Sequence, residues 1–329
     1  MKKCFIRLDA SPSLGFGHLM RCLALSDELK SSFEVIFVVR ENESKTELEK
    51  YNFDIIQIKA NSNEEDSMLL LATNNPNSIW IIDTKRKFLE KFLPSLKKNS
   101  DVVLLIENLS KNIDHADGIL FPAAHLDYNI LDPWLPKSKR DMVLTGWDWI
   151  LLRNEIINAS RSDSYFPLVI TTGGTDPSGV FFKIWELLEG AQIHATFMIG
   201  DSFANRNKLP LPDEFLKIVD YDIKYIASAG TIISTFGISV AECLFLNKPV
   251  ISVAHSKENA RGSEILSTRT PACINLGYFE DLTQERLIKE IDELKHPNEE
   301  INSWLSQNVI DGQGAKRVVS WIKRKVEEC

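Results

Sequence analysis

The stretch FIRLDASPSLGFGHLMRCLAL, residues 5–25, decides the fold. It begins as a short apolar strand that ends at Asp9, passes through a turn-rich loop with Gly15 and Gly17, and continues into a segment with helical spacing of apolar residues. A strand, a glycine loop and a helix N-terminus leave backbone N–H groups free to face an anion. The stretch therefore predicts a ligand-binding βα unit.

His18 is the candidate catalytic residue of this unit. It falls in the first turn of the predicted helix, where the positive end of the helix dipole disfavours an imidazolium. The ring is therefore expected to be neutral and able to accept a proton. In the alternative interpretation, the two glycines only shape a βα turn and His18 is an incidental residue at the helix start.

The glycine loop does not match the dinucleotide-binding fingerprint. Its third glycine is missing, and the second predicted strand, residues 33–39, is followed by Arg40 instead of an acidic residue. NAD binding is therefore not expected, and the sequence predicts no cofactor.

Composition narrows the class of protein. The 329 residues are enough for two domains, and a net charge of −8 argues against a broad nucleic-acid surface. The five cysteines form no C-x-x-C pair and their number is odd, which is typical of reduced thiols in a cytosol. The sequence shows no signal peptide and no apolar run of membrane-spanning length. A cytoplasmic protein without a nucleic-acid partner or a membrane span is expected.

Strands and helices alternate through both halves of the chain. In the first half, the predicted strands at 78–82 and 102–106 are followed by Asp83-Thr84-Lys85 and Glu107-Asn108. The alternation restarts at residue 167, after a polar segment at 161–166. Two such halves predict an α/β protein with two doubly wound parallel-sheet domains facing across a cleft, which binds ligands at the carboxyl ends of its strands. The expected domains are residues 1–147 and 148–329, the second including a linker helix and the C-terminal helix.

Two loops of the second half suit a phosphate group. Gly173-Gly174-Thr175-Asp176 and Phe236-Gly237-Ile238-Ser239 each lie between a predicted strand and a helix, so they offer backbone donors and hydroxyls. Glu242 follows in the same helix. Its carboxylate could accept hydrogen bonds from a diol such as that of ribose, or it could complete a capping box with Ser239, which local sequence alone favours.

Metal chemistry has little support in the sequence. The six histidines never fall at H-x-x-x-H spacing, and the only D-x-D, at residues 220–222, is better interpreted as a solvated turn. We therefore predict no metal site. The G-x-S-x-G elbow and the phosphate-binding P-loop are also missing.

Several separated pieces together resemble one enzyme family. They are I-R-x-D-A-S…G-x-G-H-x-x-R-C-L-x-L at 6–25, G-x-x-W-x-x-L-R-x-E at 146–155, G-G-T-D-P at 173–177, S-x-x-E…P at 239–249, E-N at 258–259 and D-G-x-G-A-x-R at 311–317. In this order they are similar to the UDP-2,4-diacetamido-2,4,6-trideoxy-β-L-altropyranose hydrolases of pseudaminic acid biosynthesis, relatives of the GT-B glycosyltransferases.

The resemblance implies a GT-B-like pair of Rossmann-like domains, in which residues 1–147 act on the sugar and residues 148–329 bind UDP. It implies hydrolysis of a UDP-activated deoxy amino sugar at the anomeric carbon, with inversion and without a metal, and His18 would orient or deprotonate the water. Glu242 would then hold ribose, which reverses the capping preference. The implied catalytic residues are His18, Asp9, Lys85 and Asn259. The implied substrate- and nucleotide-binding residues are Gly15, Gly17, Arg21, Gly173, Gly174, Thr175, Gly237, Ile238, Ser239 and Glu242.

The chain departs from the family pattern at several positions. Lys85 stands where the family has a tyrosine, Glu107-Asn108 replaces two acidic residues, and Phe236-Gly237-Ile238-Ser239 replaces a Gly-Gly-Ser-Thr loop. Ala260 follows Asn259 where the family has Gln. These changes keep two alternatives open: a GT-B glycosyltransferase with a UDP-sugar donor, and a nucleotide-sugar-binding relative without catalytic activity.

Overall fold

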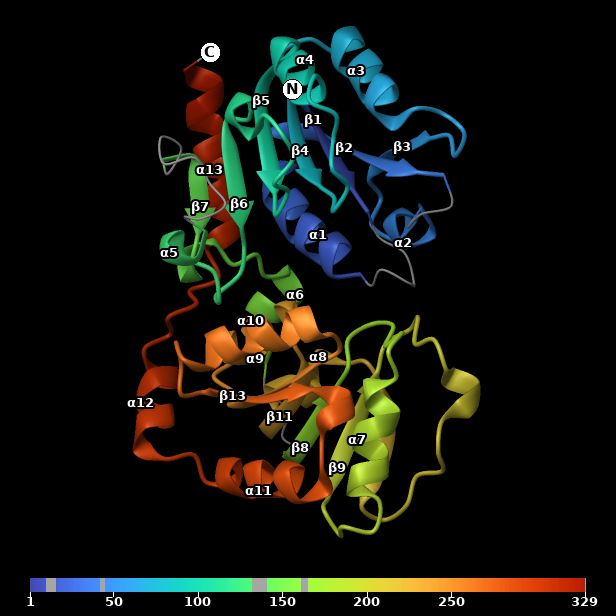
Figure 1. The fold of residues 1–329 in the computed structure, drawn as a ribbon, viewed down its shortest axis with the longest axis vertical. Coiled ribbons are helices and arrows are strands. Elements are labelled where there is room, and N and C mark those ends of the chain that lie inside the picture. The colour runs from blue at the N-terminus through green and yellow to red at the C-terminus, as the bar shows by residue number, and fades with distance from the viewer. Residues whose placement is uncertain (10–15, 42–44, 132–140, 161–164, 329) are drawn as a thin grey trace. The chain divides into compact units, whose positions relative to one another are not determined.

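The computed structural model describes residues 1–9, 16–41, 45–131, 141–160 and 165–328 (Figure 1). Gly15, one of the predicted binding residues, lies outside these ranges. The chain divides into two compact units, Met1–Arg153 with Gly312–Cys329, and Asn154–Asp311. Within the described ranges, every helix is too short or too polar to cross a bilayer.

The first unit is built on a parallel sheet, seven strands wide in the described residues, in the order β3-β2-β1-β4-β5-β6-β7. Its strands are β1 (Lys2–Leu8), β2 (Phe33–Arg40), β3 (Asp54–Ile58), β4 (Ser78–Asp83), β5 (Ser100–Ile106), β6 (Gly118–Phe121) and β7 (Val143–Thr145). Its helices are α1 (Gly17–Leu29), α2 (Lys45–Glu49), α3 (Glu64–Asn74), α4 (Phe92–Lys98), α5 (Tyr128–Leu131) and α13 (Gly314–Glu327).

Helices cover both faces of this sheet, which explains why the central strands are mostly apolar. Cys4, Ile6 and Leu8 of β1 pack with α1 and α13 in one core. Phe5 of the same strand stacks on Trp80 of β4 and packs in a second core with α3 and α4. Alternate residues of one strand therefore enter opposite cores.

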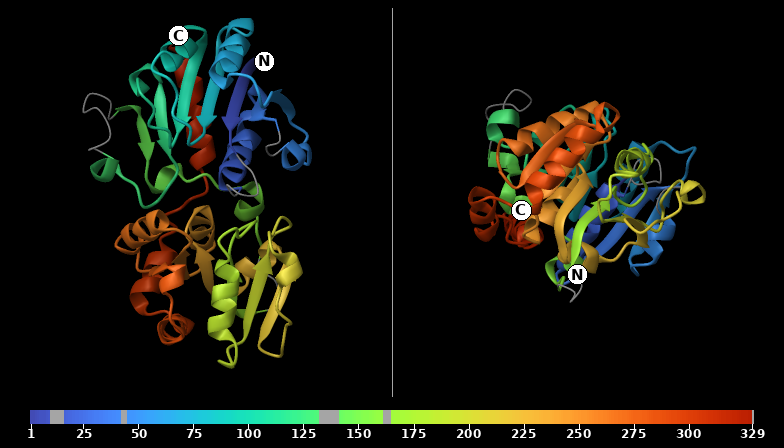
Figure 2. Two further views of the ribbon diagram at one scale, coloured as in Figure 1. Left: turned by 45° about the vertical axis from the view of Figure 1, so that its right-hand side comes forward. Right: turned by 90° about the horizontal axis from the view of Figure 1, so that it is seen from below.

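The C-terminal helix α13 belongs to the first unit, as Figures 1 and 2 show. Its apolar face, including Val318, Trp321 and Ile322, completes the core that α1 covers. A Cβ added to Gly118 of β6 would lie 2.6 Å from the Trp321 indole, so the helix packs tightly against the sheet. The expected second domain included this helix, and the compact units differ from that expectation. Their boundary also lies at Arg153 instead of residue 147.

The second unit repeats the design with a parallel sheet that has six strands in the described residues, in the order β10-β9-β8-β11-β12-β13. These are β8 (Phe166–Thr171), β9 (Ala195–Ile199), β10 (Leu216–Asp220), β11 (Ala229–Thr235), β12 (Val250–Ala254) and β13 (Cys273–Tyr278). The helices are α6 (Asn154–Ile157), α7 (Val180–Leu188), α8 (Ile223–Ala227), α9 (Ile238–Phe245), α10 (Lys257–Ser267), α11 (Gln284–Lys295) and α12 (Glu299–Ser306).

Each sheet has one topological switch point, where the chain reverses the direction in which it adds strands. It lies between β1 and β4 in the first unit and between β8 and β11 in the second. In open α/β sheets, ligands bind outside the carboxyl ends of the strands at such a point. The topology therefore singles out the loops after β1, β4, β8 and β11.

Candidate functional site

His18 and Asp83 meet at the switch point of the first unit. Helix α1 begins at Gly17, so His18 lies in its first turn as predicted, and Asp83 is the last residue of β4. The distance from His18 Nδ1 to Asp83 Oδ1 is 2.6 Å, although the two residues are 65 positions apart in sequence. Parallel pairing of β1 with β4 brings them together.

The contact fixes the tautomer of His18. A carboxylate oxygen 2.6 Å from Nδ1 requires a proton between the two atoms, so Nδ1–H donates to Asp83. Arg21 Nη2 also lies 3.1 Å from Nδ1, but it is a donor and its shorter contact is with the same Asp83 oxygen, at 2.6 Å. When the imidazole is neutral its lone pair is therefore on Nε2, which has no hydrogen-bond partner among the described residues. With its side chain 16% exposed, His18 can accept a proton from a bound molecule.

Arg21 holds the carboxylate of Asp83 in place. Its Nε and Nη2 donate to the two oxygens of Asp83, each at 2.6 Å, which is the bidentate geometry of a strong ion pair. Cys22 Sγ adds a weaker contact of 3.4 Å to Asp83 Oδ2. Burial alone would raise the pKa of the Asp83 carboxyl, but the charge and hydrogen bonds of Arg21, with the contact from His18, lower it below its ordinary value. Asp83 is therefore ionised.

Both ends of the Arg21 guanidinium are paired within this cluster. Its Nη1 lies 2.8 Å from Glu107 Oε2, so both ends of the guanidinium are paired with carboxylates, and its side chain is only 10% exposed. Arg21 was predicted to bind substrate. In the structure its contacts orient Asp83 and, through Asp83, His18, and substrate binding by Arg21 stays a prediction.

Asp9 lies in a separate ionic cluster on the sheet face that α3 covers. Arg7 Nη2 donates to Asp9 at 2.5 Å and Arg7 Nε donates to Glu64 at 2.6 Å. Arg86 pairs with the same two carboxylates, and the Thr84 hydroxyl donates to Asp9. Both oxygens of Asp9 are thus paired inside the protein, so its contacts tie the end of β1 to the end of β4.

Lys85 is not part of either cluster. Its side chain is exposed, and within the described ranges it makes no hydrogen bond or ion pair. The neighbouring Arg86 turns inward instead. Asn108 holds this loop by donating to the carbonyls of Thr84 and Arg86, at 2.6 and 2.9 Å. An amide is required there because the partners are acceptors.

In the second unit, the loop after β8 presents backbone groups at the switch point. Gly173 has a φ of +80°, a backbone conformation that favours glycine. Thr175 and Asp176 are both 3% exposed. Asp176 accepts from the N–H groups of Val180 and Phe181 at 3.0 and 2.9 Å, and burial raises the pKa of its carboxyl although these bonds oppose the shift. Asp176 therefore supports the loop, while Gly173 and Gly174 form its turn.

The loop after β11 leads directly into helix α9. Gly237 is the N-cap and makes no side-chain capping bond, and the helix begins at Ile238. Ser239 is therefore the second helical residue, so the capping-box interpretation of Ser239 and Glu242 is wrong. The N–H groups of Ile238 and Ser239 lie in the first turn, where backbone donors have no intrahelical acceptor, so they can donate to an anion. Glu242 lies on the buried side of the helix and is 3% exposed.

Asn259 supports this second loop. Its Nδ2 donates to the carbonyl of Phe236 at 3.2 Å, and its Oδ1 accepts from the Ser256 hydroxyl at 2.7 Å. The N–H of Asn259 in turn donates to Ser256, the N-cap of α10. Asn259 was predicted to be catalytic, and the structure places it where it links the α9 loop to α10.

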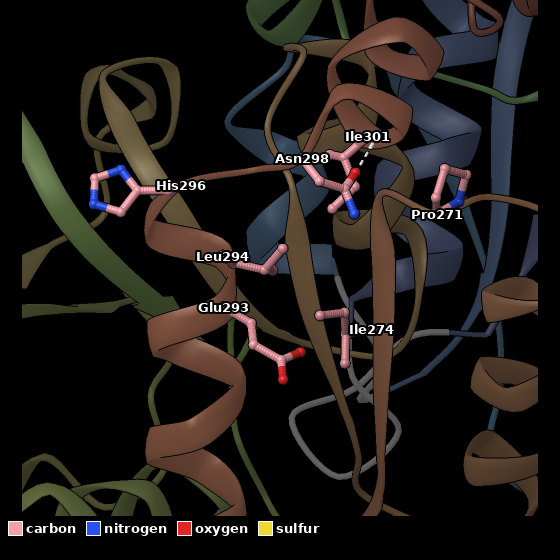
Figure 3. A pocket seen from close by; sticks show the side chains of 7 residues that line it. All are labelled: Pro271, Ile274, Glu293, Leu294, His296, Asn298 and Ile301. Carbon is pink, nitrogen blue, oxygen red and sulfur yellow. Dashed lines mark hydrogen bonds between the residues drawn. The ribbon is translucent and has the colours of Figure 1, made fainter.

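A pocket of about 370 Å³ lies elsewhere in the second unit (Figure 3). Its lining side chains come from the start of β13, the end of α11 and the start of α12, and include Ile274, Glu293 and Asn298. Because the strands are parallel, the start of β13 lies at the opposite end of the sheet from the loops after β8 and β11. The pocket is therefore separate from the switch point.

Asp83, Glu107 and Asn108 were not among the predicted site residues, although Asp83 contacts His18, Glu107 pairs with Arg21 and Asn108 holds the loop after β4. Each of the three ends or follows a buried strand, and this position in the sequence could have identified them as candidates. The contact between His18 and Asp83 could be predicted only if the order of the strands in the sheet was also known. Among the described residues, groups of three or more His, Cys, Asp or Glu side chains arranged to hold a metal ion are not found.

Comparison by sequence finds a distant relative of this chain. No protein-family model matches the chain. An uncharacterized protein of Methanocaldococcus jannaschii is 22% identical over 270 residues, which are 76% of this chain and 55% of that protein. The chain thus spans about half the length of the curated relative it matches.

Solved structures match over the whole chain. The glycotransferase of kitacinnamycin superposes with a TM-score of 0.66 at 11% identity, covering 99% of this chain and 100% of its own. A putative UDP-N-acetylglucosamine 2-epimerase from Listeria monocytogenes gives 0.64 at 16% identity, with coverages of 100% and 98%. MurG from Acinetobacter baumannii gives 0.62 at 14%, with coverages of 98% and 99%. The predicted fold class is confirmed: the chain has two Rossmann-like doubly wound domains of the GT-B type.

Proposed function

We propose that this protein hydrolyses a UDP-activated deoxy amino sugar and releases UDP and the free sugar, in nonulosonic acid or surface polysaccharide biosynthesis. The observation that carries the proposal is the 2.6 Å hydrogen bond between His18 and Asp83 at the switch point of the first unit. An imidazole fixed by a buried carboxylate, with Nε2 unbonded by the residues that the structure describes, is the arrangement of a general base.

The chemistry needs one proton acceptor and one anion site. His18 Nε2 takes a proton from water while the water oxygen forms a bond to the anomeric carbon. The bond from that carbon to the diphosphate oxygen breaks, and UDP leaves with the electron pair. Asp83 stabilises the imidazolium that forms. A positioned base of this kind contributes roughly 10²–10⁴-fold to the rate.

The second unit is proposed to bind the nucleotide. The N–H groups of Ile238 and Ser239 and the turn at Gly173 and Gly174 would donate to the diphosphate, whose negative charge grows as it leaves. Glu242 would accept hydrogen bonds from the ribose hydroxyls. The UDP-sugar enzymes among the structural neighbours support this assignment, because their fold is shared over the full chain.

The test is incubation with a panel of UDP- and CMP-activated sugars in water, with products identified by mass spectrometry. Release of free sugar from one donor is expected. The His18→Asn variant should bind UDP as tightly as the wild type by calorimetry while losing sugar release. His115→Asn, which changes an exposed histidine of the same unit, is the matched control. Wild-type turnover by His18→Asn would remove His18 from the mechanism.

A glycosyltransferase is the second candidate, favoured by the likeness to MurG and to the kitacinnamycin glycotransferase. The same His18–Asp83 pair would then deprotonate an acceptor hydroxyl in place of water. Adding candidate acceptor alcohols to the same incubations separates the two functions. A glycoside without free sugar would establish the transferase.

A further inference from the structure

Glu107, Arg21, Asp83 and His18 form a continuous chain of charged and polar contacts. Arg21 Nη1 pairs with Glu107 Oε2 at 2.8 Å, and its other donors pair with Asp83 at 2.6 Å. Asp83 accepts from His18 at 2.6 Å. One guanidinium is thus shared between two carboxylates, and only Asp83 contacts the imidazole.

The backbone of Glu107 is in an unusual conformation that brings its side chain to Arg21. Its φ is +51°, in the left-handed region that few residues other than glycine adopt. The N–H of Glu107 donates to the carbonyl of Leu120 at 3.0 Å, which holds the residue against the neighbouring strand. Strained backbone of this kind persists where surrounding contacts enforce it, and it clusters at functional sites.

The sharing of Arg21 changes the charge that His18 experiences. If Arg21 paired with Asp83 alone, the two charges would cancel and Asp83 would be a weak acceptor for the imidazole. With Glu107 included, one positive and two negative charges leave a net charge of −1 beside the ring. Excess negative charge strengthens the hydrogen bond from Nδ1–H and stabilises an imidazolium when it forms.

We propose that Glu107 is a positioning residue for His18, and that it acts by sharing the positive charge of Arg21 with Asp83. The proposal rests on the proposed function in one respect, namely that His18 serves as the base. Glu107 keeps Asp83 a strong hydrogen-bond acceptor. Asp83 in turn keeps the proton on Nδ1 of His18 and favours uptake of a second proton at Nε2.

The charged groups that face the pair are few in the part of the chain that the structure describes. Arg21 comes from α1, Asp83 from β4 and Glu107 from the end of β5, while the Cys22 thiol touches Asp83. Helix α13, which packs against α1, buries apolar residues there, and its Arg317 donates to the carbonyl of Asp148. The Asp9 cluster lies on the other face of the sheet. Removal of the Glu107 carboxylate therefore changes the net charge that Arg21 and its partners present to His18.

The test compares Glu107→Gln with Asp117→Asn. Both remove one carboxylate of a surface-accessible ion pair in the first unit, since Asp117 pairs with Lys97 at 2.7 Å and is 19% exposed. The readout is the Nδ1–H proton resonance of His18 in protein labelled with ¹⁵N-histidine. Glu107→Gln should move this resonance upfield because Asp83 becomes a weaker acceptor. Asp117→Asn should leave it in place, and Glu107→Asp should retain part of the wild-type position.

The pH profile of kcat/KM supplies the second readout. In Glu107→Gln, the pH below which activity falls should move lower by about 0.3–1 unit, because less negative charge remains beside the ring to stabilise the imidazolium. A His18 resonance that does not move in Glu107→Gln overturns the proposal, and so does the lack of a hydrogen-bonded Nδ1–H in the wild type. If the resonance moves but no donor sugar is hydrolysed, the electrostatic role of Glu107 stands and the proposed hydrolase function fails.

Discussion

The two units share one topology but present different chemistry at the same place. At the β1/β4 switch point, the side chains are ionisable: His18, Arg21, Asp83 and Glu107 form a chain of contacts that are each 3.1 Å or shorter. At the β8/β11 switch point, the groups presented are glycines, a serine and helix N–H groups. The difference teaches that the topology of a doubly wound sheet singles out one place on it, while the loop residues decide which chemical groups are presented there.

Asp83→Asn should have the largest effect, and this effect should be confined to the first unit. The amide cannot accept from both His18 and Arg21 as a carboxylate does, so turnover should fall by about 10³–10⁴-fold. Affinity for UDP, measured by calorimetry, should stay within about twofold because the second unit is unchanged. Turnover near the wild-type level would show that the pair has no catalytic role. Circular dichroism should be recorded in parallel, because Arg21 loses a buried partner.

Glu242→Gln should weaken UDP binding by the second unit and leave the first unit unchanged. If the Glu242 carboxylate accepts hydrogen bonds from ribose, its loss should weaken UDP binding by about 10–100-fold, the range for a hydrogen bond to a charged group. The Nδ1–H resonance of His18 should be unchanged. Equal UDP affinity in variant and wild type would contradict the assignment of Glu242 to ribose.

Gly118→Ala should lower the stability of the first unit alone. The added methyl group would overlap the Trp321 indole, which α13 contributes to that core, and should cost about 1–2 kcal/mol in the free energy of unfolding. Urea denaturation followed by a probe in each unit can separate the two transitions. Gly17→Ala is the control for stability, because a Cβ there meets no atom within 4 Å. A shift in both transitions would show that the packing of α13 also stabilises the second unit.

Two buried aspartates should have opposite effects on the free energy of unfolding as the pH falls. The pKa of Asp83 is below its ordinary value of about 4, so its carboxylate stabilises the fold above that pH and the stabilisation is lost as the pH falls. The pKa of Asp176 is raised by burial, so the folded state binds that proton more tightly and gains stability as the pH falls.

The slope of stability against pH measures these contributions. Between about pH 3 and pH 6, Asp83→Asn should flatten the acid loss of the first unit, and Asp176→Asn should steepen that of the second. Urea midpoints at several pH values provide the measurement. Slopes that do not change in either variant would contradict the two shifts.

Much of the fold could be predicted from local sequence. Apolar runs such as residues 33–39 and 102–106 indicate strands buried on both faces, and the alternation with helices indicates parallel sheets. The placement of α13 could not be predicted in the same way. Its apolar stripe shows that the helix buries one face, but the partner of that face, including Gly118 and Leu151, is set by tertiary packing.

The candidate site was predictable to a similar depth. The position of His18 in the first helical turn follows from the glycine loop, and the structure confirms it. The 2.6 Å contact with Asp83 depends on β4 lying beside β1, which no local pattern reveals. Lys85 and Arg86 show the same limit of local sequence. Both are cations in one loop, but only tertiary structure shows that Arg86 is the one that reaches the buried carboxylates of Asp9 and Glu64.

The docking of α13 on the first unit has a consequence for synthesis on the ribosome. The first unit needs residues 314–327 to close one of its two cores, and these are translated after the whole of 154–311. The second unit is continuous in sequence and can fold as soon as it emerges. The half of the protein that carries His18 is therefore completed only after the second unit has been made, so its nascent strands stay exposed to aggregation while residues 154–311 are synthesised.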